Sequence, residues 1–213
     1  MPFVGVSWDA PIFLQKSCAK NKFPHRRIAF QAEERRTFMN KKLDVQVMVE
    51  SAIMIALAVV LSFFKILQMP QGGSVSLAMI PILLLAFRRG PLCGISSGVI
   101  FGVISLTIDG VIYHPLSVLF DYTLAFGVLG VAGFFKKNYT GIIAGTVVGV
   151  ALRFVCSLIS GAVLFAEYAP KGQNPWIYSV VYNGTYMLPE LVICVVVLVV
   201  LFKTAKKLFL TKA

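Results

Sequence analysis

Residues 177–203 read IYSVVYNGTYMLPELVICVVVLVVLFK, an apolar segment whose polar side chains, apart from the terminal Lys203, lie in its first half. A helix of about 20 residues crosses the hydrocarbon core of a bilayer, because each residue adds about 1.5 Å. At about 100° per residue, all the polar side chains from 178 to 190 except Thr185 fall within one arc of about 140°. They are Tyr178, Ser179, Tyr182, Asn183, Tyr186 and Glu190. We therefore expect a membrane helix that turns this polar stripe toward protein or a cavity and its Val, Ile and Leu face toward lipid.

The rest of the chain is nearly as apolar from Gln46 onward. Of 213 residues, 58% are hydrophobic and 14% are charged, and the mean hydropathy is +0.83. A soluble domain is nearer half apolar and a quarter charged, so the composition argues against a water-soluble enzyme. We predict an all-α integral membrane protein, a six-helix transmembrane bundle. Its spans are expected at about 47–67, 75–88, 91–109, 115–135, 139–166 and 177–203. The second span is short, and the turn-rich run Met69–Ser74 before it is a candidate re-entrant loop.

The net charge is +11, from 20 Lys and Arg against 9 Asp and Glu. The basic residues are distributed along the chain as the positive-inside rule predicts. In a soluble protein such an excess would suggest a nucleic-acid partner. Here the apolar spans indicate basic cytoplasmic loops beside a lipid bilayer, and no nucleic acid is expected. With both termini cytoplasmic, 17 of the 20 basic residues lie inside, and Lys65 and Lys171 lie outside. We therefore expect a multi-pass protein of the cell membrane with cytoplasmic N- and C-termini.

The N-terminal segment differs from the rest of the chain. Residues 1–46 hold nine of the 20 basic residues and lack the apolar core of roughly 7–15 residues that a secretory signal needs. We expect residues 1–38 to form a basic, disordered extension. Residues 39–213, starting at Met39, are then the six-span membrane substrate-binding domain.

The chain lacks the parts of most enzymes. It has two histidines, His25 and His114, and four cysteines without metal-ligand spacing, so neither a Ser–His hydrolase nor a metal site is expected. It also has no Walker A pattern, so any ATP hydrolysis must take place in partner proteins. We therefore expect a binding subunit that is not an enzyme and holds no cofactor and no metal.

Ionisable residues within spans are costly and are candidates for function. The four here are Glu50, Asp121, Arg153 and Glu190. Glu50, near the end of its span, and Arg153 are expected to be structural, Arg153 as the partner of a carboxylate or of backbone carbonyls. Asp121, beside Tyr122, would attract a cationic ligand, although an ion pair with Arg153 is the alternative. Aromatic rings around one acid suit a flat, cationic, nitrogen-rich ligand.

Small residues repeat every four positions in three spans, a pattern that lets helices approach closely. They are Gly94, Gly98 and Gly102, then Gly141, Gly145 and Gly149, and finally Ala52 and Ala56. For the two glycine rows we expect ordinary packing within the bundle.

Several separate motifs, in order, resemble the thiamine-specific S component of energy-coupling-factor (ECF) transporters. The first group is MPQGGSVSL at 69–77, MIP at 79–81 and FRRG at 87–90. The second is FDY at 120–122 and LAF at 124–126. The third is ISG at 159–161, YAPKG at 168–172, PWIYS at 175–179, YN at 182–183 and YMLP at 186–189. The resemblance extends from about residue 43 to about residue 205, across the whole membrane domain.

This resemblance implies six helices with both termini inside and capture of thiamine from outside the cell. It also implies transport driven by a transmembrane T subunit and two ATPase subunits. The acid–Tyr pair of the family falls on Asp121 and Tyr122, and its C-terminal Tyr and Asn fall on Tyr178 and Asn183. The aromatic residue before the YAPKG loop falls on Phe165. Asp121 would neutralise the thiazolium, while Tyr122, Phe165 and Tyr178 stack on the ligand.

Three further positions follow from the resemblance. The Ala-xxx-Ala contact with the T subunit falls on Ala52 and Ala56. Ser157 stands where the family usually carries a ligand-contacting His, and is expected to hydrogen-bond the aminopyrimidine together with Asn183. This departure leaves open an S component for another vitamin or for a thiamine precursor. A membrane scaffold without a ligand, in which the Tyr/Asn stripe packs dry, is the remaining alternative.

Overall fold

The computed structural model describes residues 45–209 except 71–72, 110–114, 169 and 171. The extension expected at residues 1–38, and the expected start of the membrane domain at Met39, lie outside the described residues. The described helices and strands belong to one compact unit that begins at Val45.

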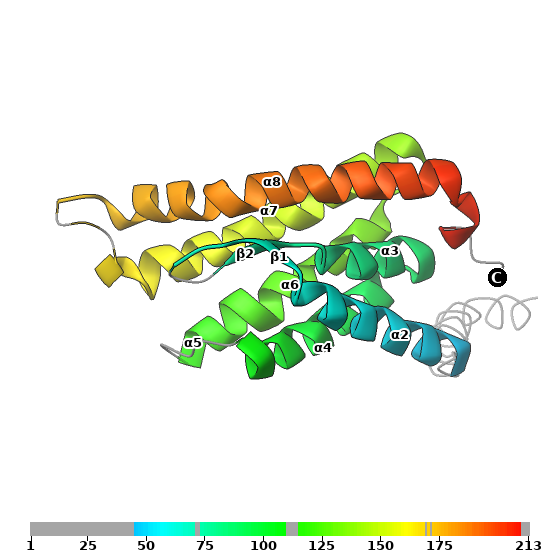
Figure 1. Ribbon diagram of the computed structural model, residues 1–213, viewed down its shortest axis with the longest axis horizontal. Coiled ribbons are helices and arrows are strands. Elements are labelled where there is room, and N and C mark those ends of the chain that lie inside the picture. The colour runs from blue at the N-terminus through cyan, green and yellow to red at the C-terminus, as the bar shows by residue number, and fades with distance from the viewer. Residues whose placement is uncertain (1–44, 71–72, 110–114, 169, 171, 210–213) are drawn as a thin grey trace, which may run out of the picture. The chain divides into compact units, whose positions relative to one another are not determined.

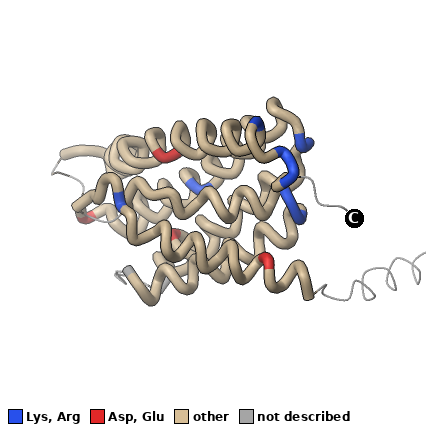
Figure 2. Tube along the Cα trace, turned by 45° about the vertical axis from the view of Figure 1, so that its right-hand side comes forward, with Lys and Arg blue, Asp and Glu red and all other residues tan. Residues whose placement is uncertain are grey.

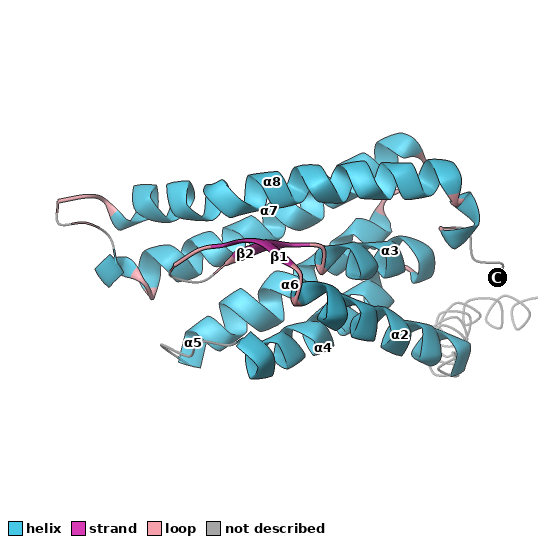
Figure 3. Cartoon of the chain, viewed as in Figure 1, coloured by secondary structure: helices cyan, strands magenta, loops and turns pink. Residues whose placement is uncertain are grey.

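The described part is built from six helical segments (Figures 1 and 3). They are α2 (Val45–Ser62), α3 (Met79–Arg89), α4 (Pro91–Asp109), the composite segment Pro115–Phe134, α7 (Tyr139–Val163) and α8 (Pro175–Thr204). The composite segment consists of α5 (Pro115–Ser117), the π-helix η2 (Val118–Leu124), α6 (Ala125–Gly127) and the 3₁₀ helix η3 (Val128–Phe134). Two further 3₁₀ turns are η4 (Ala166–Tyr168) and η5 (Lys206–Leu208), and two short strands are β1 (Lys65–Gln68) and β2 (Ser74–Ser76). The predicted all-α, six-helix architecture is confirmed.

The helices differ in their capacity to cross a membrane. Within the described residues, α2, α4, α7 and α8 are long and apolar enough to do so. With 11 residues, α3 extends only about 16 Å, about half the thickness of a hydrocarbon core. All of Met79–Phe87 is buried, so the neighbouring helices surround α3 and spare it contact with lipid. The second span was expected from residue 75, but its helix begins at Met79 because Ser74–Ser76 forms a strand.

The candidate re-entrant loop at Met69–Ser74 lies within a β-hairpin. Strands β1 and β2 pair antiparallel, and the turn between them is closed by the amide of Met69, which donates to the carbonyl oxygen of Gly73 at 3.0 Å. Val75 on β2 is 1% exposed. The backbone amide and the hydroxyl of Ser76 each donate to Oε1 of Glu190 on α8, both at 3.4 Å. Strand pairing therefore satisfies backbone groups that would be costly inside a membrane protein.

The glycine row of α4 brings that helix against the composite segment. A Cβ on Gly98 would lie 2.2 Å from the carbonyl oxygen of Phe126, and one on Gly102 would lie 2.3 Å from that of Tyr122. Both distances are shorter than van der Waals contact, so the two backbones touch only because these residues are glycine. This contact fixes the height of Tyr122 and of its neighbour Asp121 in the bundle.

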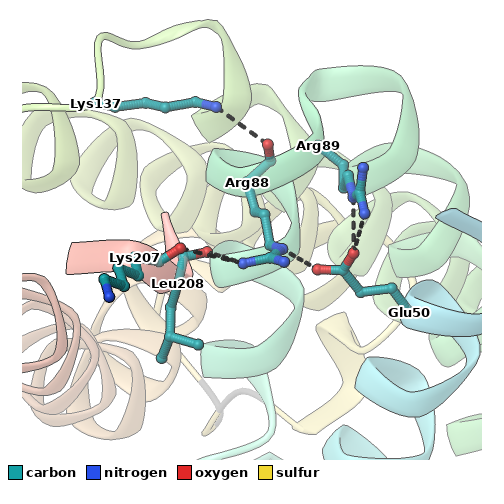
Figure 4. A network of polar contacts seen from close by, with 6 residues as sticks. All are labelled: Glu50, Arg88, Arg89, Lys137, Lys207 and Leu208. Carbon is teal, nitrogen blue, oxygen red and sulfur yellow. Dashed lines mark hydrogen bonds and ion pairs between the residues drawn. The ribbon is translucent and has the colours of Figure 1, made fainter. Parts of the chain in front are cut away.

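Charged side chains tie the helices together at one end of the unit, where Figure 2 shows most of the described basic residues. Glu50 on α2 forms ion pairs with Arg88 and Arg89 at the end of α3, and Arg89 Nε donates to Glu50 Oε2 at 2.8 Å (Figure 4). Arg88 Nη1 donates to the carbonyl oxygen of Leu208 at 2.8 Å, and Lys137 Nζ donates to that of Arg88 at 3.1 Å. Glu50 thus has the structural role that its position near the end of a span predicts.

Candidate ligand-binding cavity

The interior of the bundle contains a cavity of about 340 Å³. Its walls come from the hairpin, from α4, from η2 and α6, and from the facing halves of α7 and α8. Every binding residue expected from the sequence lies on these walls: Asp121, Tyr122, Ser157, Phe165, Tyr178 and Asn183. A volume of this size is at the lower end of the range that small-molecule sites occupy.

Asp121 is positioned by η2 and α7. Its Oδ2 accepts a 2.5 Å hydrogen bond from the hydroxyl of Ser160, one of the polar residues that share a face of α7. The alternative expectation, an ion pair between Asp121 and Arg153, is wrong: Arg153 pairs with Glu190 instead. Within the described part of the chain, no Lys or Arg nitrogen lies within ion-pair distance of Asp121. A carboxylate in this position favours a ligand that brings a positive charge.

Arg153 is held from three sides. Its Nη1 lies 3.3 Å from Glu190 Oε2 and 2.6 Å from the sulfur of Met79, and its guanidinium lies 4.4 Å above the centre of the Phe126 ring. Glu190 is 1% exposed and also accepts from Ser76 on the hairpin. The pair thus joins α7, α8 and the hairpin, and neutralises two charges that would be costly apart.

The aromatic wall follows α8. The rings of Tyr178 and Tyr182 stack with centroids 5.9 Å apart, and the ring of Tyr186 meets that of Tyr182 edge-on at 6.3 Å. Phe165 and Tyr168, 6.0 Å apart, add rings from the end of α7 and from η4. The polar stripe of α8 faces the interior, where its tyrosines, Ser179 and Asn183 line the cavity and Glu190 is buried. On the opposite face, Val181, Leu188 and Val192 are exposed. The orientation predicted for the stripe is confirmed.

Asn183 and Ser157 lie where α7 and α8 pack together. Asn183 Nδ2 donates to the carbonyl oxygen of Ser179 at 2.9 Å and to that of Ser157 at 3.4 Å. The hydroxyl of Tyr186 donates to Asn183 Oδ1 at 2.7 Å. Ser157 itself is 8% exposed and lines the cavity. The two residues expected to hydrogen-bond an aminopyrimidine are therefore neighbours in the wall.

Several lining residues were not anticipated. Phe101 and Ser105 on α4, Phe126 on α6, and the hairpin residues Gln68 and Ser74 all line the cavity. Ser74 and Phe126 lie in motifs that resemble the family, but neither was assigned to the site. Nothing in the sequence marks the other three, because Phe101 and Ser105 lie in an apolar helix and Gln68 lies at the end of an expected span. Lys65 on β1 is a further charged residue in the wall. The described residues contain no group of three His, Cys, Asp or Glu side chains that would hold a metal ion.

Comparison with known proteins assigns the chain to a family. Residues 48–210 match the family "Thiamine transporter protein (Thia_YuaJ)", a range that covers all of the described bundle except the first three residues of α2. The chain belongs to this thiamine transporter family. Its members are membrane carriers rather than enzymes, in agreement with the expectation of a binding subunit.

Individual relatives cover most of the chain. The "Thiamine transporter ThiT" of Bacillus subtilis (strain 168) is 40% identical over 186 residues, which are 80% of this chain and 97% of the relative. The protein of the same name from Lacticaseibacillus paracasei is 30% identical over 191 residues, 82% of this chain and 95% of the relative. A solved structure of ThiT from Listeria monocytogenes superposes with a TM-score of 0.70 at 27% identity, covering 78% of this chain and 98% of that structure. The resemblance to thiamine-specific carriers is confirmed.

Proposed function

We propose that this chain is the thiamine-binding S component of an ECF-type importer, and that it captures thiamine in the cavity between the hairpin, η2, α7 and α8. The observation that carries the proposal is Asp121, a carboxylate in an aromatic cavity whose described partner is a hydroxyl and not a cation. Thiamine is a cation with two planar heteroaromatic rings joined by a methylene group, and the family to which the chain belongs consists of thiamine transporters.

The wall residues divide into two chemical roles. Asp121 neutralises the thiazolium, and Tyr122, Phe165 and Tyr178 stack against the rings of the ligand through cation–π and aromatic contact. Asn183 and Ser157 hydrogen-bond the aminopyrimidine. Tyr178 and Asn183, one residue from each role, come from the same stripe of α8.

Ser157 makes this site different from the family pattern, in which a His contacts the ligand. A hydroxyl donates and accepts as an imidazole does, but it is shorter and offers no ring for stacking. A thiamine precursor that carries the aminopyrimidine alone is therefore the second candidate ligand. The residue that favours it is Ser157.

The partners follow from what the chain lacks. The sequence has no ATP-binding motif, and the resemblance to ECF S components supports two ATPase subunits and a transmembrane T subunit as the proteins that drive uptake. Ala52 and Ala56 lie exposed on α2, of which only Ile55 and Ala58 are buried. A small-xxx-small row on an exposed apolar helix supports a closely packed contact with the T subunit.

The basic end of the unit supports an orientation in the bilayer with both termini cytoplasmic. Arg88, Arg89 and Lys137 lie at this end together with the basic residues that follow α8. Under the positive-inside rule that end faces the cytoplasm, and the loops beside the ligand cavity face outside.

Isothermal titration calorimetry of thiamine into the detergent-purified chain tests the proposal. We expect one thiamine site per chain and a lower affinity for the neutral aminopyrimidine precursor than for thiamine. Stronger binding of the precursor than of thiamine would transfer the assignment to the second candidate. No binding of either compound by folded protein would overturn the proposal and favour another vitamin or a scaffold role.

A further inference from the structure

A directed chain of hydrogen bonds runs through the wall of the cavity where α7 meets α8. The hydroxyl of Ser179 donates to the carbonyl oxygen of Leu158 at 2.9 Å. Asn183 Nδ2 lies 3.2 Å from Ser179 Oγ, and Tyr186 donates to Asn183 Oδ1 at 2.7 Å. The three side chains are nearly inaccessible, with exposures of 2% for Ser179, 6% for Asn183 and 5% for Tyr186.

The polarity of this chain is fixed at the Leu158 end. A backbone carbonyl accepts hydrogen bonds and cannot donate, so the proton of Ser179 must point at Leu158. Toward Asn183, Ser179 Oγ is then left as an acceptor, and the amide must turn its nitrogen to it. The carbonyl oxygens of Ser179 and Ser157 require the same orientation of the amide.

Because its amide is fixed, Asn183 can offer a ligand only a hydrogen-bond acceptor. The hydrogens of Nδ2 point toward oxygen atoms of the protein, and one lone pair of Oδ1 takes the proton of Tyr186. An amide oxygen has two lone pairs, so the remaining capacity of Asn183 is that of an acceptor. An acceptor in a buried wall fits an amino group and leaves a carbonyl oxygen at the same position without a donor.

A close contact at Gly161 makes this arrangement possible. A Cβ on Gly161 would lie 2.4 Å from Ser179 Oγ and 3.3 Å from Asn183 Nδ2. Any larger residue at this position would displace the serine hydroxyl from Leu158. The glycine therefore lets α7 and α8 approach closely enough for the chain of hydrogen bonds to form.

We propose that Ser179 is a specificity-determining positioning residue: with its proton directed at Leu158, its hydroxyl oxygen joins the two backbone carbonyl oxygens in holding Asn183 as an acceptor, so that the site selects ligands with an amino group over ligands with an oxo group on the heteroaromatic ring. This inference rests on the proposed function and adds to it a residue that determines the preference for an amino group over an oxo group. Ser179 acts through Asn183 and needs no contact with the ligand.

The test compares thiamine with oxythiamine, in which the 4-amino group of the pyrimidine is replaced by an oxo group. Calorimetric affinities of both compounds give a selectivity ratio for each variant. For the unmodified chain we expect a preference of at least about tenfold for thiamine, because an unmatched buried hydrogen-bonding group weakens binding by about that factor. In Ser179→Ala and Gly161→Ala we expect this ratio to fall at least threefold.

Two variants separate positioning from general damage to the cavity. In Tyr186→Phe, which removes the last donor of the chain but leaves Leu158, Ser179 and Asn183 in place, we expect the ratio to persist even where both affinities fall. In an Asn183→Ala background, Ser179→Ala should have no further effect on the ratio. Thr185→Ala removes an exposed hydroxyl of α8 that bonds to Tyr182, and serves as the matched control.

Each outcome bears on one claim. Absence of thiamine binding to the unmodified chain would contradict the proposed function. Tight thiamine binding without an amino preference, or an unchanged ratio in Ser179→Ala, would overturn the inference about Ser179 and leave the proposed function intact. Gly161→Ala displaces the same hydroxyl, so an unchanged ratio in that variant would overturn the inference even where Ser179→Ala does not fold.

Discussion

Arg153 on α7 and Glu190 on α8 form an ion pair with 3.3 Å between Nη1 and Oε2, next to the cavity and away from both ends of the bundle. The carboxylate of Glu190 is 1% exposed and holds Ser76 of the hairpin with its other oxygen. One pair of charges therefore fixes three elements, and it leaves Asp121 as the carboxylate available to a cationic ligand.

Removing one member of this pair should destabilise the protein strongly. Arg153→Met leaves Glu190 buried without a counter-charge, and loss of one partner from a buried pair costs about 3–5 kcal/mol. We expect a clear drop in the thermal unfolding midpoint in detergent, monitored by circular dichroism. The double variant Arg153→Met/Glu190→Leu should recover part of it, because neither charge is then left alone. Glu167→Gln, at an exposed acid, is the control and should unfold like the unmodified chain. A double variant less stable than Arg153→Met would contradict this account.

Neutralising Asp121 should weaken cationic ligands selectively. In Asp121→Asn the side chain still accepts from Ser160 but no longer attracts the thiazolium. The quaternary thiazolium has no N–H, so the contact is a charge–charge attraction, and because such attraction is strong in a partly buried site we expect thiamine affinity to fall roughly 10- to 100-fold. The neutral aminopyrimidine precursor should lose no more than about threefold, since it carries no charge to be neutralised. Calorimetry with both compounds measures the difference, and equal losses would rule out the charge-pairing role of Asp121.

Helical periodicity in the sequence was enough to predict the wall formed by α8. Tyr178 and Asn183 share a face of one long helix, and an arc of polar side chains in an apolar span faces the interior in almost any bundle. The partner of Arg153 depends on tertiary structure instead. Asp121 and Glu190 are both carboxylates within spans, and only the packing of α7 against α8 brings Glu190 to the guanidinium. The sequence therefore left both pairings open.

The hairpin was missed for a different reason. Lys65–Gln68 continues the apolar run of α2, and strands of three or four residues are too short for alternation to distinguish them from a loop. What stabilises β2 is its contact with α8, where Ser76 meets Glu190 across 114 positions of sequence. The π-helix η2 is a comparable case, because no residue pattern in Val118–Leu124 marks the change of pitch.

Gly73 and Gly90 offer a matched pair for testing whether the packing of the hairpin turn against Tyr186 controls the cavity. Both have positive φ, +88° and +94°, so an alanine at either position is strained by about 1–2 kcal/mol. A Cβ on Gly73 would also lie 2.7 Å from the ring of Tyr186, whereas one on Gly90 meets nothing within 4 Å. We expect both variants to lose stability, but only Gly73→Ala to lose thiamine affinity, by about tenfold or more. Equal affinities in the two variants would show that the hairpin turn does not control the cavity.

Ala52 and Ala56 should matter for assembly and not for ligand capture. Both lie exposed on α2, a helix that shares only Ile55 and Ala58 with the buried core of the described unit. Leucine at these positions adds bulk to a face that is expected to pack closely against the T subunit, and close packing of small residues does not tolerate such an increase. In Ala52→Leu/Ala56→Leu we therefore expect unchanged thiamine affinity by calorimetry and a large loss of co-purification with the T subunit and its ATPases. Val196→Leu, which adds bulk to the exposed face of α8, is the control for lipid-facing substitutions. Retained co-purification in the alanine variant would place the partner contact on another face, and loss of thiamine binding would instead connect α2 to the cavity.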